Sequence, residues 1–359
     1  MEEFFVESLQ SSELVLLAFG AELKNTFAFF KEGRISFFCH GDTSLLDNLE
    51  EAERDARALL SENEKSLLLY DKHPLYNSSS LAQSLALEFG QKSFSVQHHV
   101  AHAFATAFEH GLGNFLAIVC DGTGYGEDGN IWGGEVFHND KRIGRLEYQT
   151  LLGGDAASLD AKRVLYPLLL KCNLEEKIPL EDRSLALLWQ RQIQEGFSCI
   201  ESSSCGRIFD ALAALLGLGS TNEYEAQLAL ALEAAAKKGN VDLSLLPECK
   251  IWEEDGLFVL GTCELFCFVA KHLGKMSVED LALLSHYYLS RGLFEIARRY
   301  DSKLPLLFSG GCAYNSIMQE FFRERGVLLC RRQSPGDEQI ALGQITYYLW
   351  RKERGDFGG

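Results

Sequence analysis

The stretch FLAIVCDGTGYGEDGNIWGGEVF, residues 115–137, decides the fold. Phe115–Cys120 is an apolar run that predicts a buried strand, and Ile131–Phe137 predicts a second one. Asp121–Gly126 predicts a glycine-rich turn at which backbone N–H groups can approach an anion closely. An ordinary hairpin turn is the alternative, because aspartate and glycine are common there too.

The same order of elements occurs earlier in the chain. Val15–Phe19 predicts a strand, residues 20–25 a polar turn, and Thr26–Lys31 and Arg34–Cys39 two further strands. A third strand at Ile143–Tyr148 completes the later copy. The repeat is one of topology, and it predicts two similar α/β lobes whose loops can face each other across an anion.

The rest of the chain suggests how the lobes are divided. We expect one lobe over residues 1–113, completed by a C-terminal helix at 337–352. A second lobe would span 114–336 and carry a helical insertion at 156–300, with charged and turn residues through 246–256.

Composition excludes several classes of protein. The 359 residues contain 34 Lys and Arg against 51 Asp and Glu, a formal charge of −17, which argues against a broad nucleic-acid surface. No apolar run is long enough for a membrane span, and Met1–Glu13 lacks the pattern of a secretory signal. The ten cysteines form no CxxC pair, so zinc fingers and a disulfide framework are disfavoured. We expect a cytoplasmic protein with neither nucleic-acid nor membrane partners.

The sequence HHVAH at residues 98–102 is a candidate metal site. His98 and His102 are four residues apart on a predicted helix, so they share one face, as in many zinc sites. A metalloprotease is disfavoured because His99 occupies the position where a zincin has its catalytic glutamate. Packing and hydrogen bonding are the alternative role.

Three further segments are weak signals individually. Ser309–Gly311 lies between a predicted strand and a helix, an arrangement that binds phosphate. Gly153-Gly154-Asp155 is a flexible turn beside an acid, and Asp337 precedes the last helix, where an acid is common. Asp210 and Glu225 lie in helical stretches, where acids usually face solvent.

In combination these segments resemble the C-terminal, TsaD-like region of the HypF family, the carbamoyltransferases of [NiFe]-hydrogenase maturation. The segment DGTGYGEDGNIWGGE (121–135) is the most specific, and related O-carbamoyltransferases of antibiotic biosynthesis share it. The matching motifs are GAELKNTF (20–27), DKHPLY (71–76), VQHHVAHA (96–103), GGDAA (153–157), GRIFDALAALLGL (206–218), YEAQ (224–227), SGGCAYN (309–315) and DEQIALGQ (337–344).

The resemblance implies an actin-like ATPase (ASKHA) fold of two ribonuclease-H-like lobes, with a metal and nucleotide cleft between them. It implies one iron or zinc ion, and ATP or carbamoyl-adenylate as the nucleotide. Lys24 and Arg163 are expected to stabilise charge during catalysis. The implied metal ligands are His98, His102, Asp121 and Asp337. The implied nucleotide contacts are Gly122, Thr123, Gly124, Gly154, Asp155, Gly206, Asp210, Glu225, Gly310, Gly311 and Asn315.

The resemblance also implies a reaction, in which the carbamoyl group of carbamoyl-adenylate passes to the C-terminal cysteine thiol of HypE. The acylphosphatase, zinc-motif and YrdC-like segments of full HypF chains are not among these 359 residues, so we expect a separate YrdC-like protein to supply the adenylate. Glu338-Gln339 replaces the usual Gly-Gly after Asp337, and we expect an altered phosphate contact.

Other functions stay open on the sequence. O-carbamoylation of a small hydroxylated molecule requires the same metal and nucleotide residues. A non-catalytic nucleotide-binding maturation scaffold is a third reading. Threonylcarbamoylation of tRNA is less favoured, because the acidic chain has no basic surface for tRNA.

Overall fold

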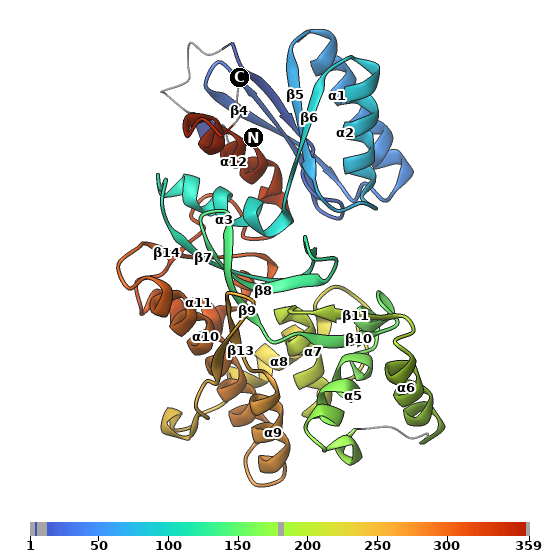
Figure 1. Cartoon of the computed structure of the whole chain (residues 1–359), viewed down its shortest axis with the longest axis vertical. Coiled ribbons are helices and arrows are strands. Elements are labelled where there is room, and N and C mark those ends of the chain that lie inside the picture. The colour runs from blue at the N-terminus through green and yellow to red at the C-terminus, as the bar shows by residue number, and fades with distance from the viewer. Residues whose placement is uncertain (1–3, 6–12, 179–182, 357–359) are drawn as a thin grey trace. The chain divides into compact units, whose positions relative to one another are not determined.

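The computed structural model describes residues 4–5, 13–178 and 183–356 (Figure 1). Most of the N-terminal segment used for the targeting argument lies outside these residues. The chain divides into two units. Unit 1 comprises Met1–Phe115, Ser309–Gly311 and Leu329–Gly359, and unit 2 comprises Leu116–Phe308 and Cys312–Leu328. Unit 1 therefore also takes in three short segments that we had assigned to the second lobe, residues 114–115, 309–311 and 329–336.

Unit 1 is built on a mixed sheet. The predicted meander is confirmed, because β2, β3 and β4 pair antiparallel, while β5 and β6 run parallel to β2. Parallel strands need crossover connections, and α1 and α2 supply them. In the described residues the strand order is β1 (Phe4–Phe5), β4 (Arg34–Gly41), β3 (Asn25–Lys31), β2 (Val15–Ala18), β5 (Ser66–Asp71) and β6 (Lys92–Val96).

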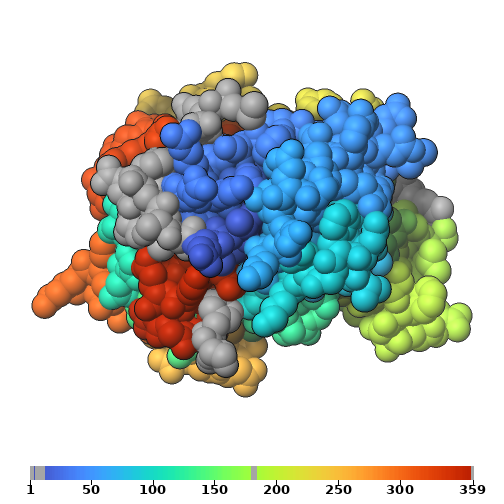
Figure 2. Space-filling model, turned by 90° about the horizontal axis from the view of Figure 1, so that it is seen from above, coloured from blue at the N-terminus to red at the C-terminus, as the bar shows by residue number. Residues whose placement is uncertain are grey.

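Two helix pairs cover the two faces of this sheet. Leu17 and Leu68 pack against α1 (Leu46–Ser61) and α2 (Asn77–Glu88). The alternate residues, such as Leu16 and Leu69, pack against α3 (His98–Glu109) and α12 (Ile340–Glu353). The N-terminal elements in blue therefore adjoin the C-terminal helix in red, although they are far apart in sequence (Figure 2).

Unit 2 contains a second mixed sheet. Its β7–β8–β9 meander corresponds to the strands predicted from residues 115–148. The order of the main path is β12 (Ile251–Glu254), β13 (Leu257–Leu260), β9 (Lys141–Leu146), β8 (Ile131–His138), β7 (Leu116–Tyr125), β14 (Leu306–Ser309) and β15 (Leu328–Leu329). Off this path, β11 (Cys199–Ser202) pairs with β8, and β10 (Gln149–Leu152) pairs with β11.

The predicted turn at Asp121–Gly126 was wrong in one respect. Strand β7 continues to Tyr125, and the chain reverses only at residues 126–130. Between the Cys120–Gly134 and Gly124–Trp132 pairs, three residues of β7 face the single residue Gly133. Asp121–Thr123 therefore form a bulge. Periodicity identifies the strand, but it cannot separate a bulge from a turn when both require glycine.

The insertion predicted at residues 156–300 is not entirely helical. Residues 156–300 include the strands β11, β12 and β13 besides their helices. The β12–β13 hairpin turns at Asp255-Gly256, where both residues have positive φ, and its acidic strand reads as a loop in the sequence. The helices of unit 2 are α4 (Ala156–Leu159), α5 (Lys162–Lys171), α6 (Arg183–Glu195), α7 (Cys205–Leu215), α8 (Gln227–Ala236), α9 (Cys263–His272), α10 (Val278–Tyr300) and α11 (Ser316–Arg323).

Among the described residues, no helix is both long and apolar enough to cross a membrane.

Close packing of α12 on α3 gives a stability prediction. A Cβ atom at Gly343 would lie 1.9 Å from the carbonyl oxygen of Ala101, which is backbone and cannot move aside cheaply. Gly343→Ala should therefore destabilise the protein by about 3 kcal/mol. Urea unfolding measures this. Gly113→Ala is the control, since its Cβ would meet nothing within 4 Å, and an equal loss there would contradict the packing argument.

Candidate metal and nucleotide-binding site

Three of the predicted metal ligands converge within unit 1. His98 and His102 lie on one face of α3, buried to 1% and 0% exposure. Their Nε2 atoms lie 3.6 Å and 3.5 Å from the same carboxylate oxygen, Oδ1 of Asp337. Asp337 begins the 3-10 turn η5 (Asp337–Gln339) that leads into α12. The helix pair that covers the sheet thus brings these residues together.

The spacing of these atoms fits a metal ion. Metal–nitrogen and metal–oxygen bonds of about 2.1 Å, at tetrahedral to octahedral angles, separate ligand atoms by about 3.0–3.4 Å. The observed separations slightly exceed this range and are too long for direct hydrogen bonds. The ligand atoms of His98, His102 and Asp337 all lie within 4.8 Å of one another. Two imidazoles and a carboxylate are also the donors that iron and zinc accept.

Asp71 fixes the orientation of His98. The carboxylate of Asp71, at the end of β5, lies 2.7 Å from Nδ1 of His98, and both side chains are 1% exposed. This contact orients the ring, with Nδ1 toward Asp71 and Nε2 toward Asp337. This carboxylate–histidine arrangement is typical of metal sites. Asp71 lies in the DKHPLY motif (71–76) but had no predicted role.

His102 has a different neighbour. Its Nδ1 lies 3.3 Å from the amide nitrogen of Gln339, which also lies 3.0 Å from the hydroxyl oxygen of Ser309. Gln339 is fully buried and stands where the HypF pattern has glycine. Its side chain therefore fills space beside a candidate ligand, while Glu338 accepts a hydrogen bond from Ser334.

The loop after β14 adjoins this cluster. The hydroxyl of Ser309 donates to the carbonyl oxygen of His102 at 3.1 Å. Gly310 follows with φ of +91°, a conformation that favours glycine, and Gly311 opens the turn η4 (Gly311–Tyr314). The predicted phosphate loop at Gly310 and Gly311 thus lies beside the histidines.

In unit 2, the remaining predicted metal ligand, Asp121, lies in the bulge of β7. Asp121 is buried, and its Oδ1 accepts the N–H of Gly122 at 2.7 Å. Ser204, the N-cap of α7, donates to the carbonyl oxygens of Asp121 and Gly122. A Cβ at Gly206 would lie 2.8 Å from Gly122 Cα, so only glycine lets the helix approach this closely. The positive end of α7 therefore lies against the bulge.

A buried polar network holds the backbone opposite the bulge. Oε1 of Glu135 accepts the N–H groups of Gly133 and Gly134, each at 3.2 Å. Its Oε2 pairs with Arg142 at 2.6 Å, and that guanidinium lies 3.9 Å from the centre of the Trp132 ring. Glu135 and Arg142 carried no predicted role. Only their contacts in the structure identify them.

The other residues predicted to contact nucleotide differ in exposure. Thr123 is exposed at the tip of the bulge and Gly124 is buried. Asp210 is fully buried and pairs with Arg207 at 2.9 Å; burial raises its pKa while Arg207 opposes that effect. Glu225 is exposed, just before Ala226. A ribose contact by Asp210 or Glu225 stays a prediction.

Lys24 and Arg163 belong to different units. Lys24 lies half-buried in the turn before β3 of unit 1. Arg163, near the start of α5 in unit 2, donates to the carbonyl oxygen of Leu152 at 3.5 Å and would lie 3.0 Å from a Cβ at Gly153. Gly154 has positive φ, and Asp155 is exposed at the start of α4. Arg163 thus accompanies the predicted glycine–aspartate loop.

The side chain of Asn315 is already engaged. Its Oδ1 accepts the N–H of Met318 and caps α11, and its Nδ2 lies 3.0 Å from Nε2 of His286. His286 is fully buried and stacks on Phe209. Burial lowers the pKa of His286 to about 4, so the ring is neutral and accepts from Asn315. Asn315 positions the helix after the glycine loop.

Comparison with known proteins defines the class of this fold. A sequence profile described as "Carbamoyltransferase, Kae1-like Domain, second subdomain" matches residues 117–344. A second profile, "HypF Kae1-like domain", matches residues 11–109. The full-length HypF structure in the phosphate- and nucleotide-bound form superposes with a TM-score of 0.86 at 25% identity, over 95% of this chain and 56% of that one. HypF of T. kodakarensis gives a TM-score of 0.84 at 30% identity, over 95% and 48%. The predicted actin-like ATPase fold, in its Kae1-like form, is confirmed.

The chain belongs to the HypF carbamoyltransferase family. It is 32% identical to the probable carbamoyltransferase HypF of Methanocaldococcus jannaschii, over 93% of this chain and 46% of that protein. It is also 32% identical to the carbamoyltransferase HypF homolog of Cupriavidus necator, over 93% of this chain and 91% of that protein. The chain thus spans about half of the first relative and of both solved structures, and nearly all of the second relative.

Replacing the carboxylate behind His98 tests the orientation argument. Asp71→Asn removes the charge that holds Nδ1–H, so the affinity for zinc should fall by about 10- to 100-fold. Competition with a chromophoric chelator measures this affinity. Asp55→Asn is the matched control. Oδ2 of Asp55 lies 3.1 Å from Nε2 of His40, and neither residue is a candidate metal ligand. Equal affinities for wild type and Asp71→Asn would contradict the assignment.

Burial of His286 predicts a pH dependence of stability. In the unfolded chain His286 gains a proton below its ordinary pKa of about 6.5, whereas in the folded protein it stays neutral down to its lowered pKa of about 4. The unfolded state therefore binds more protons in this window, and His286 should remove about 3 kcal/mol of stability as the pH falls through it.

Urea unfolding across this pH range, in wild type and in His286→Gln, isolates the contribution. The variant should have a lower free energy of unfolding at neutral pH than wild type, but this free energy should fall less as the pH is lowered. Parallel curves for the two proteins would show that His286 does not titrate in this way.

Proposed function

We propose that this chain transfers the carbamoyl group of carbamoyl-adenylate to the C-terminal cysteine thiol of HypE during [NiFe]-hydrogenase maturation. Membership of the HypF family supports the chemistry. The observation that carries the proposal is the convergence of His98, His102 and Asp337, with His98 oriented by Asp71. Buried imidazoles and a carboxylate in this arrangement are suited to binding an ion rather than to packing a hydrophobic core.

We assign Asp121 as the fourth ligand of a single iron or zinc ion, from the family pattern and its place beside the bulge. His98, His102 and Asp337 supply the other donors. The ion, when bound, supplies positive charge to a phosphate oxygen of the nucleotide and so stabilises the leaving group.

The chain's own backbone binds the rest of the phosphate. The bulge presents Gly122, Thr123 and Gly124 next to the N-terminus of α7, whose dipole favours an anion. The glycines at 310 and 311 provide a second loop. We also assign Gly154, Asp155, Gly206, Asp210, Glu225 and Asn315 to the nucleotide site, the buried ones acting by holding the contacting segments in place.

The transfer step requires no covalent enzyme intermediate. The HypE thiolate attacks the carbamoyl carbon, a carbon–sulfur bond forms, and the bond from that carbon to the phosphate oxygen breaks to release AMP. Lys24 and Arg163 stabilise the developing charge. A separate YrdC-like protein in the cytoplasm supplies carbamoyl-adenylate.

Direct transfer tests the proposal. Synthetic carbamoyl-adenylate, this chain loaded with iron or zinc, and HypE should together give HypE one carbamoyl group heavier at its C-terminal cysteine, as measured by mass spectrometry. His98→Ala should lower the rate by more than about a hundredfold, because it removes a ligand of the ion. Asp55→Asn, at the other histidine–aspartate pair, should keep the wild-type rate.

The same assay distinguishes the alternatives. Unmodified HypE together with a carbamoylated small alcohol would support O-carbamoylation in place of the proposed transfer. Nucleotide binding without transfer to either acceptor, and maturation unaffected by His98→Ala, would show that the chain is a scaffold.

A further inference from the structure

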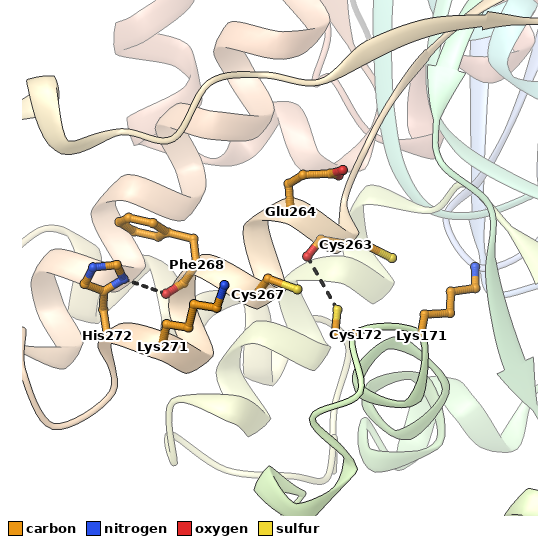
Figure 3. A pocket seen from close by; sticks show the side chains of 8 residues that line it. All are labelled: Lys171, Cys172, Cys263, Glu264, Cys267, Phe268, Lys271 and His272. Carbon is orange, nitrogen blue, oxygen red and sulfur yellow. Dashed lines mark hydrogen bonds between the residues drawn. The ribbon is translucent and has the colours of Figure 1, made fainter.

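Unit 2 contains a cavity of about 360 Å³ whose lining residues carry none of the roles assigned above. It lies where the C-terminal end of α5 meets α9 (Figure 3). Its lining includes Lys171, Cys172, Cys263, Cys267, Lys271 and His272. Neither the family resemblance nor the proposed transfer gives these residues a role.

Three thiols gather on one wall of this cavity. Cys263 and Cys267 are four residues apart on α9 and so share a face. Cys172 is the C-cap of α5, and its thiol donates to the carbonyl oxygen of Cys263 at 3.5 Å. Hydrogen bonding with the Cys263 thiol, burial, and hydrogen bonding with the Cys267 thiol all raise the pKa of Cys172. One thiol thus lies next to two others.

A carboxylate lies beside these thiols. Oε1 of Glu147 is 3.5 Å from Sγ of Cys263. Its other oxygen, Oε2, accepts the N–H groups of Thr262 and Cys263 at 3.0 Å and 3.2 Å. Glu147 is therefore fixed at the N-terminus of α9 with one oxygen directed at the thiol. In a tetrahedral zinc site, a sulfur and an oxygen ligand are also about 3.5 Å apart.

Solvent reaches this group of thiols. Cys172, Cys263 and Cys267 are each partly exposed, whereas Cys120 and Cys205 in the core of unit 2 are buried. Lys171 and Lys271 also line the cavity, and Nζ of Lys171 donates to the carbonyl oxygen of Tyr148 at 2.8 Å. A metal ion can therefore reach the thiols from solvent.

We propose that Cys172, Cys263 and Cys267, with Glu147, bind one thiophilic divalent cation of the zinc class. Each cysteine releases its proton as its sulfur binds the cation, so three protons are released per ion. Each cysteine turns about a single side-chain bond, so bringing the sulfurs together costs little entropy. The bound cation joins the end of α5 to α9. This cation-site proposal does not depend on the carbamoyl-transfer proposal.

Cadmium is the probe, because its bonds to thiolates give a charge-transfer absorption that nitrogen and oxygen ligands do not. The full chain, reduced and stripped with a chelator, should develop this absorption with one equivalent of Cd²⁺. Cys172→Ser, Cys263→Ser and Cys267→Ser should each weaken Cd²⁺ binding by more than about tenfold. His98→Ala, which removes a ligand of the other proposed metal site, should leave the maximum absorption at saturating Cd²⁺ unchanged.

Two cysteine controls and a melting measurement complete the experiment. Cys199→Ser removes a partly exposed thiol that bonds the carbonyl oxygen of Gln192, and Cys205→Ser removes a buried one; both should keep the absorption. Zn²⁺ should raise the melting temperature of wild type more than that of Cys172→Ser, which also shows whether the variant is folded. Absorption that persists without the three thiols, or that disappears in Cys205→Ser, overturns the proposal. A disulfide at Cys172 in the chain as isolated, before reduction, also overturns it.

Discussion

The hydrogen bond between the carboxylate of Asp71 and Nδ1 of His98 is the contact on which the candidate site depends. It joins the end of β5 to the first turn of α3, and it determines which imidazole nitrogen faces Asp337. Both partners are buried, so water cannot replace either of them. The parallel pairing of β5 with β6 places them together, since β6 leads directly into α3. The sheet therefore determines the chemistry of the histidine.

An acidic chain requires an unusual way of binding an anion. With a net charge of −17, the protein offers no broad basic surface. In the proposed nucleotide site, backbone N–H groups would take the place of lysines and arginines. They would come from the bulge at Asp121–Thr123, the start of α7 and the glycines after β14. Glycine is required at Gly206 by close approach and at Gly310 by its positive φ. Local geometry thus provides the positive potential that composition lacks.

Much of this arrangement could be predicted from the sequence, within limits set by distance along the chain. The two histidines share a helix face because of their spacing, and the meander strands follow from alternating burial. Asp337 was expected only by resemblance, because nothing local connects it with α3. Asp71 received no role, since its partner depends on strand pairing. The bulge was mistaken for a turn, and the acidic β12–β13 hairpin was missed, because local composition hides both.

The contact between Gly343 and Ala101 has a consequence for synthesis of the protein on the ribosome. Helix α12 covers one face of the first sheet, yet it is translated after all of unit 2. Until it emerges, the apolar residues of β2 and β3 on that face have α3 beside them but lack the cover that α12 provides, whereas the main segment of unit 2 is already complete. Nascent unit 1 therefore exposes a hydrophobic sheet while unit 2 folds, and it is the part of the chain that chaperones should bind. The candidate ligand Asp337 is translated with the same late segment, so the proposed metal site is complete only after unit 2 has been synthesised.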